Sequence, residues 1–266
     1  MDLLAPFLGL KNALLAAVVF IALERAIPKE PRQKILRPNW LNDLIYLVFN
    51  RWFIGYGITL LLLLMTTHPI VPASLRRAVA GQNLWVHIIE ILLVADLAFY
   101  LVHRLFHAVP MLWRFHQIHH SIEHMDWLAG YRVHPIDQIL TRGGSLIPCV
   151  ALGFSGTAFG IFGMIYFAHS VLLHSNVRIS FGPLRWLIAS PQFHHWHHSR
   201  EPDAWGKNFA GELSLIDILF GTAYMPKGQW TPSYGIHDVL PRNYVGQLAY
   251  PFVRLSGTQT VSDPGT

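Results

Sequence analysis

Four long apolar segments alternate with polar segments along the chain. The first three run from about Leu3 to Leu23, from Leu41 to Thr67 and from Leu84 to His107. Each is long enough for a helix to cross a hydrocarbon core of about 30 Å. The fourth, Gly143 to Val177, contains no Asp, Glu, Lys or Arg, and as a single helix it would be roughly 50 Å long. Because a glycine-containing stretch at 153–156 lies near its middle, we expect two shorter helices that form a hairpin.

The composition points to the same class of protein. Apolar residues make up 52% of the 266 residues and charged residues only 13%, whereas soluble domains carry about 25% charged residues. These values exclude disorder for most of the length. The net charge of +5 is compatible with nucleic acid, but the hydrophobicity favours basic cytoplasmic loops instead. We therefore predict an all-α integral membrane protein, with about four transmembrane helices and no nucleic-acid partner.

The loop charges predict an orientation in the membrane. The segment 25–38 holds five Lys or Arg residues, and the segment 68–82 holds two. The positive-inside rule then places 25–38 in the cytoplasm and the N-terminus outside. Following the crossings, the polar, histidine-rich stretches at 108–138 and 179–225 also fall on the cytoplasmic side. We expect them to form a helical, His-rich cap, and we expect the tail at 256–266 to be disordered.

Histidine is the unusual residue of this sequence. Thirteen of the 16 histidines lie between His103 and His198. They include one HxxxH, at 103–107, and two HxxHH patterns, at 116–120 and 194–198. Chance would give roughly 0.06 HxxHH matches in such a chain. In a helix the spacings i+3 and i+4 place imidazoles on one side. Eight such rings exceed the four or so ligands that one zinc needs, so the count indicates two metal ions. The single cysteine, Cys149, excludes a disulfide framework within the chain and a multi-cysteine metal site.

Several metals and chemistries fit a nitrogen-rich site without thiolate. Iron, zinc, copper and nickel all accept imidazole, but two redox-active irons at the lipid interface suit O2 activation beside a buried C–H bond. One alternative is a membrane zinc hydrolase, which needs a carboxylate base such as Glu123, Asp126 or Glu201. The other is a non-enzymatic metal-binding or transport protein. We rank it last, because the histidines cluster at helix ends and in polar loops.

Asp96 is a candidate catalytic-site residue. It precedes His103 by seven positions and His107 by eleven, which places all three within about 40° of one helix face. Asp96 could therefore accept a hydrogen bond from a ligand imidazole, or it could make a buried polar contact to another helix. Tyr100 lies on the same face and could pair with Asp96.

The order of these motifs on this hydropathy profile resembles the fatty acid hydroxylase/sterol desaturase superfamily of integral-membrane, non-haem di-iron oxygenases. The resemblance covers about Asp96 to Pro226. It extends beyond the histidine boxes to the stretches HSIEHMDW followed by RVHP (residues 120–135), HSNVR and FGPL (174–184), and KNFAG and DILFGT (207–222). It implies three parts: membrane helices at 1–95, a catalytic domain at 96–226 and a C-terminal extension at 227–266.

The resemblance also implies a set of metal ligands. Two further histidines join those of the boxes: His174 as a ninth ligand, and His134, which either ligates or orients a ligand. His124, His169 and His195 stay open. The implied ligands are His103, His107, His116, His119, His120, His134, His174, His194, His197 and His198.

The implied activity is the O2-dependent hydroxylation or desaturation of an aliphatic C–H bond in a lipid, whether sterol, carotenoid, fatty acyl chain or ether lipid. The cofactors expected are two iron ions, with zinc possible in the protein as purified. Because the sequence contains no cysteine cluster and no fused haem motif, electrons are expected from a separate ferredoxin or cytochrome b5-like donor. The expected location is a bacterial inner membrane, with the active site facing the cytoplasm.

Overall fold

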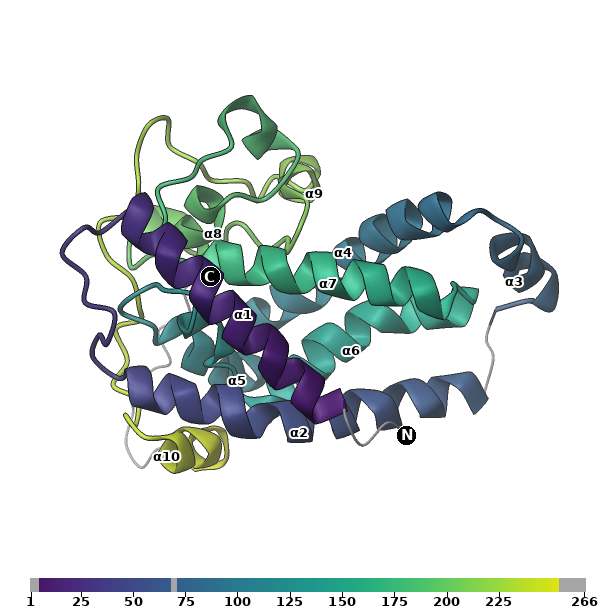
Figure 1. Ribbon diagram of the computed structural model, residues 1–266, viewed down its shortest axis with the longest axis horizontal. Helices are drawn as coiled ribbons and strands as arrows, with labels where there is room; N and C mark the ends of the chain where they lie inside the picture. The colour runs from purple at the N-terminus through teal and green to yellow at the C-terminus, as the bar shows by residue number, and fades with distance from the viewer. Residues whose placement is uncertain (1–4, 68–70, 254–266) are drawn as a thin grey trace.

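The computed structural model describes residues 5–67 and 71–253, and these ranges are helical with no strand (Figure 1). Only two isolated β-bridges occur there, Pro28 with Val177 and Ser199 with Tyr234. The predicted disorder of 256–266 lies outside the described residues. The long helices are α1 (Ala5–Ala26), α2 (Trp40–Thr67), α4 (Leu84–Ala108), α6 (Pro135–Leu152) and α7 (Gly156–His174).

The predicted helical hairpin is confirmed. Gly153 ends α6 with φ at +85°, a left-handed conformation that glycine adopts without strain. Two residues later the Ser155 hydroxyl accepts a hydrogen bond from the backbone N–H of Ala158 at 3.2 Å and so caps the start of α7. The apolar run therefore folds back on itself, because its middle residues favour the end of one helix and the start of another.

Three helices of the described residues are long and apolar enough to cross a membrane: Trp40–Leu64 within α2, all of α4 and all of α7. Large apolar side chains on the long helices face outward, such as Val18 at 71% exposure and Leu60 at 59%. Such a surface suits contact with lipid rather than water. Helix α6 carries Asp137 and Arg142 in only 18 residues. The number of crossings stays a prediction.

The shorter helices gather at the two ends of the long ones. Helix α3 (Ala73–Ala80) lies at one end, where it packs against α6. The others form a cap at the opposite end (Figure 1). The cap contains α5 (Pro110–His120), α8 (Pro191–His197), α9 (Ser214–Leu219) and α10 (Tyr244–Ala249), with 3-10 turns at Ala129–Tyr131, Gly182–Trp186, Pro202–Ala204 and Tyr250–Phe252.

The basic connection between α1 and α2 packs against this cap (Figure 1). The Arg37 guanidinium donates to both oxygens of Asp126, at 2.9 and 2.8 Å, and both side chains are buried. Lys29 Nζ donates to the carbonyl of Thr231 at 2.9 Å. The segment rich in Lys and Arg and the histidine-rich segments therefore share one end of the molecule. That this end faces the cytoplasm stays a prediction.

Candidate metal centre

Nine buried imidazoles of the described residues form two adjoining groups in the cap. Within each group one ring nitrogen of every residue lies within 4.8 Å of those of all the others. The groups touch, since the rings of His120 and His198 have centroids 4.5 Å apart. The first group, called the five-histidine group, consists of His103, His107, His116, His120 and His197; the second, the four-histidine group, consists of His119, His174, His194 and His198.

The two HxxHH motifs each divide their histidines between the groups. Residues four apart stay together: His116 and His120 in the five-histidine group, and His194 and His198 in the four-histidine group. The residue between them joins the other group, His119 in one motif and His197 in the other. A helical turn separates i+3 from i+4 by about 100°, so one turn of helix supplies rings to both groups.

Five of the nine rings have Nδ1 directed at an oxygen that can only accept. Because these oxygens carry no proton, Nδ1 must donate and Nε2 keeps its lone pair. This arrangement fixes the ring orientation and leaves Nε2 free to bind a cation. The contacts are His103 with Phe209 O (2.6 Å), His116 with Asp137 Oδ2 (2.8 Å), His119 with Arg132 O (3.1 Å), His174 with Ser170 O (2.8 Å) and His197 with Lys207 O (2.8 Å).

These lone pairs face one another inside each group. The Nε2 atoms of His103 and His116 are 2.9 Å apart, and those of His119 and His174 are 3.2 Å apart. Two unprotonated nitrogens at this distance repel each other unless a cation lies between them. In addition, both ring nitrogens of His107 are buried without a partner, which is costly in a folded protein. The residues of each group therefore fit a metal ion.

The pKa values agree with neutral rings in the cap. Burial lowers the pKa of His119, His120, His194 and His198 well below the usual value of 6.5, and lowers that of His197 to about 3. A neutral imidazole is the form that binds metal.

Buried acidic residues position the carbonyls that hold these rings. Asp217 accepts hydrogen bonds from the backbone N–H groups of Phe209 and Ala210, both at 2.8 Å, and Phe209 supplies the carbonyl that binds His103. In the same way Asp43 of α2 binds the Arg132 guanidinium, with a distance of 2.9 Å between Oδ2 and Nη2. The closing sequence motif and the second membrane helix thus both support the histidine groups.

The structure places His134 outside both groups, although the sequence counted it among the ligands. Its Nδ1 accepts from the N–H of Ile136 and caps α6, and its Nε2 contacts the carbonyl of Leu248 at 3.2 Å. With both nitrogens engaged by backbone, His134 contacts neither group. The reason is local, because the residue before a proline at position N1 is the place of a helix cap.

Of the two roles left open for Asp96, the structure gives the buried polar contact. Its oxygens accept hydrogen bonds from the backbone N–H groups of Gly211, Glu212 and Leu213 at 2.6 to 3.0 Å. The predicted pairing of Tyr100 with Asp96 is wrong, since the Tyr100 hydroxyl instead lies 3.0 Å from Thr222 Oγ1.

The three histidines left open also lie outside the groups. His195 is held by the Tyr234 hydroxyl and the Ser175 carbonyl, His169 pairs with Glu212, and His124 lines a surface pocket. The residue that sequence reasoning missed is Asp137, the carboxylate on His116. Its signal was an acidic residue in the first turn of α6.

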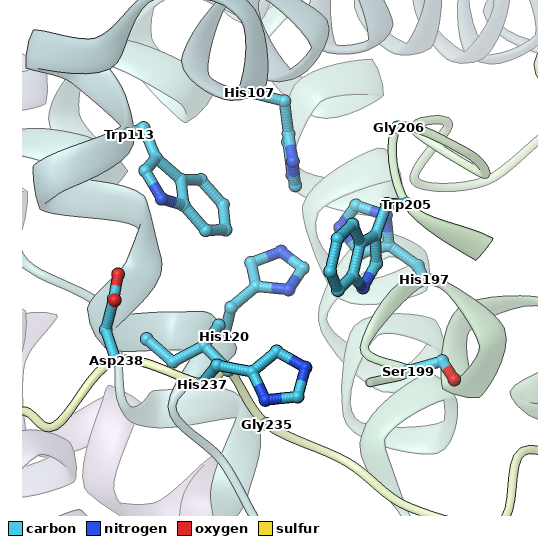
Figure 2. A pocket seen from close by; sticks show the side chains of 11 residues that line it. His107, Trp113, His120, His197, Ser199, Trp205, Gly206, Gly235, His237 and Asp238 are labelled. Atoms are coloured by element: carbon cyan, nitrogen blue, oxygen red, sulfur yellow. The ribbon is translucent and has the colours of Figure 1, made fainter. Parts of the chain in front are cut away.

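Cavities approach the centre from two sides. On the surface of the cap a small pocket of about 30 Å³ reaches His107, His120 and His197. Figure 2 shows these rings turned toward a common space, with Trp113 and Trp205 beside them. On the membrane side, a chamber of about 70 Å³ lined by histidines of both groups adjoins an apolar cavity of about 430 Å³ between α2, α4, α6 and α7.

Residues 88–222 match the sequence profile of the fatty acid hydroxylase family, and this range contains all nine histidines. The chain belongs to the fatty acid hydroxylase family. The family resemblance of the sequence is thereby confirmed, and with it the expectation of a membrane oxidoreductase of lipid metabolism with histidine boxes.

Named relatives of this fatty acid hydroxylase act on lipids. It is 28% identical to the ornithine lipid hydroxylase OlsE of Rhizobium tropici over 90% of this chain and 74% of that protein. It is 31% identical to human alkylglycerol monooxygenase and 28% identical to that of Xenopus tropicalis, over 48% of this chain in each case. The matched segment spans only 28% of those two monooxygenases. No solved structure gives a significant match.

Proposed function

We propose that this protein is a membrane lipid hydroxylase that binds two iron ions and inserts one oxygen atom of O2 into an aliphatic C–H bond. The observation that carries the proposal is the pair of adjoining histidine groups with inward-facing Nε2 lone pairs. Bound iron would supply the activation of O2. The relatives favour hydroxylation over desaturation, since their names are hydroxylase and monooxygenase.

The residues of the chain do the positioning. Asp137 and four backbone carbonyls hold five imidazoles in the orientation that leaves Nε2 free. The apolar cavity between α2, α4, α6 and α7 receives the lipid from the bilayer. The chamber beyond it excludes bulk water from the reacting carbon. Because the surface pocket at His107 and Trp205 opens on the cap, a separate ferredoxin or cytochrome b5-like donor would deliver electrons on that side, which we place in the cytoplasm.

The zinc-hydrolase alternative receives no support from its candidate bases. Asp126 binds the Arg37 guanidinium with both oxygens. Glu123 is 60% exposed and pairs with Arg200 at 3.2 Å. None of the three candidates, Glu201 included, lines the chamber between the histidine groups and the membrane cavity.

Metal analysis and isotope labelling test the proposal. Protein purified without oxygen should contain about two irons per chain and, given a chemical reductant, should consume O2 only when bacterial lipid extract is present. With ¹⁸O2 one lipid class should gain one ¹⁸O atom. Product formation without O2, or zinc that cannot be replaced by iron with gain of activity, would overturn it. The variant His119→Ala should lose iron and O2 consumption together.

A further inference from the structure

The membrane cavity and the histidine-lined chamber meet at four residues that line both. We call this junction the neck; it consists of Phe99, Arg142, Tyr166 and Glu212. A lipid entering from the bilayer must pass the neck to reach the histidines. The chamber beyond it, at about 70 Å³, has room for only a few non-hydrogen atoms.

Glu212 is held rigidly in the neck. Its side chain is only 6% exposed, and its Oε2 lies 2.6 Å from His169 Nδ1. Its backbone N–H donates to Asp96 and its backbone carbonyl accepts from Ala189 N at 2.8 Å. The other carboxyl oxygen, Oε1, is buried without a hydrogen-bond partner. Buried oxygens in folded proteins normally have one.

The positions of the protons on His169 and Glu212 show that Oε1 needs a hydrogen-bond donor. His169 Nε2 lies 2.8 Å from the Ala189 carbonyl and must donate to it. Nδ1 then either carries a second proton and faces a Glu212 carboxylate, or it accepts from a protonated Oε2. In both states Oε1 has no proton, so it is an acceptor that lacks a donor.

Arg142 makes the neck still less suited to a plain hydrocarbon chain. Its guanidinium lies 5.1 Å from the centre of the Tyr166 ring. The Gln138 amide satisfies its hydrogen bonds when its oxygen faces Arg142, and this oxygen then accepts from the guanidinium at 3.0 and 3.1 Å. Among the described residues Arg142 has no ion pair. A methylene group between Arg142 and Glu212 would remove both side chains from water and would offer them neither a hydrogen bond nor a charge.

We propose that Glu212 is a specificity-determining residue that accepts a hydrogen bond from an O–H or N–H donor of the lipid. The apolar part of that lipid lies in the membrane cavity, and the oxidised carbon lies only a few bonds from the donor. This inference rests on the proposed function and narrows its substrate to lipids oxidised near their polar end.

Binding of paired lipid probes tests the inference without turnover. Purified protein in nanodiscs, without oxygen or reductant, is offered hexadecanol or its methyl ether, and hexadecylamine or its trimethylammonium analogue. Each pair differs in the donor, and the amine pair keeps its charge. Native mass spectrometry measures the bound lipid. Since a hydrogen bond to a buried carboxyl is lost in the capped probe, the donor probe of at least one pair should bind about ten-fold more tightly.

Three variants separate the role of the oxygen from that of the charge. Glu212→Leu should reduce the preference to less than about two-fold. Glu212→Gln retains a side-chain carbonyl and should keep a preference in the alcohol pair. The matched control Glu123→Gln alters an exposed glutamate and should bind like the unmodified protein. Melting temperature and metal content are followed in each.

Two binding results overturn the inference: equal binding of donor and capped probes by the unmodified protein, or a preference that survives in Glu212→Leu. The first needs no variant, so a folding failure leaves the test intact. Lipid products also bear on it, because oxygen inserted in mid-chain would contradict it. If the protein bound the donor probes selectively but formed no O2-dependent product, the proposed function would be wrong and the role of Glu212 in lipid binding would still hold.

Discussion

His119 and His120 are neighbours in the chain, yet their rings belong to different histidine groups. His119 lies with His174, at 3.2 Å between Nε2 atoms, and His120 lies with His116, at 3.2 Å. The last turn of α5 therefore joins the two groups, and the geometry of one site depends on the other.

Alanine at these two positions should have unequal effects. His119→Ala leaves three imidazoles in the four-histidine group, whereas His120→Ala leaves four in its own. We expect His119→Ala to lose one metal ion per chain on dialysis against a weak chelator, and His120→Ala to retain most of both. Elemental analysis measures this, with His124→Ala as the control. Equal losses in the two variants would contradict the division into groups.

Asp137→Asn tests the orientation of His116. The amide has the same shape but weakens the hydrogen bond to Nδ1, which lowers the basicity of the ring. Loss of such a partner typically reduces metal affinity about 10- to 100-fold. Competition with a chromogenic chelator measures the affinity. The thermal stability of the metal-free protein should change little by comparison. An unchanged metal affinity would contradict a role of Asp137 in orienting His116.

The variant His134→Ala tests whether His134 caps helix α6 or binds a metal ion. The variant should retain both metal ions and lose about 1 kcal/mol of unfolding free energy, the usual cost of removing a cap. Denaturant unfolding in detergent gives the free energy. If metal were lost while stability held, His134 would be a ligand after all.

Asp96→Asn should act through folding rather than through the metal. The new side chain keeps one acceptor oxygen, but its NH2 group replaces the other and faces at least one of the three backbone N–H groups that now donate to the carboxylate. About 1 to 3 kcal/mol of stability should therefore be lost. Metal content per folded chain should stay the same. A chelator-sensitive variant of normal stability would argue for direct contact with the centre.

Acid should destabilise the metal-free protein. In the unfolded chain the imidazoles of the cap titrate near pH 6.5, but in the folded protein the pKa of His119, His120, His194 and His198 is lowered. The unfolded state therefore takes up protons as the pH falls below about 6.5, and the folded state does not. Each such ring lowers the free energy of unfolding by up to about 1.4 kcal/mol for every pH unit below that value. Unfolding at pH 7.5, 6.5 and 5.5 measures this, and constant stability would contradict it.

The sequence by itself predicted the long apolar helices, and its histidine boxes contain eight of the nine histidines that the structure brings together. The apolar runs gave boundaries within a few residues of α2, α4 and α7, because helix length in a membrane is set by the bilayer and glycine and proline end helices locally. The spacing of the histidine boxes selected the residues that the structure gathers in the cap.

Only the tertiary structure decided how these residues are shared out. Which group receives His119 depends on the direction from which α7 brings His174. Asp137 and His134 differ by three positions, yet one holds a ring of the centre and the other caps a helix. The neck joins residues of α4, α6 and α7 to Glu212. Such contacts between distant segments arise from packing, which local patterns do not encode.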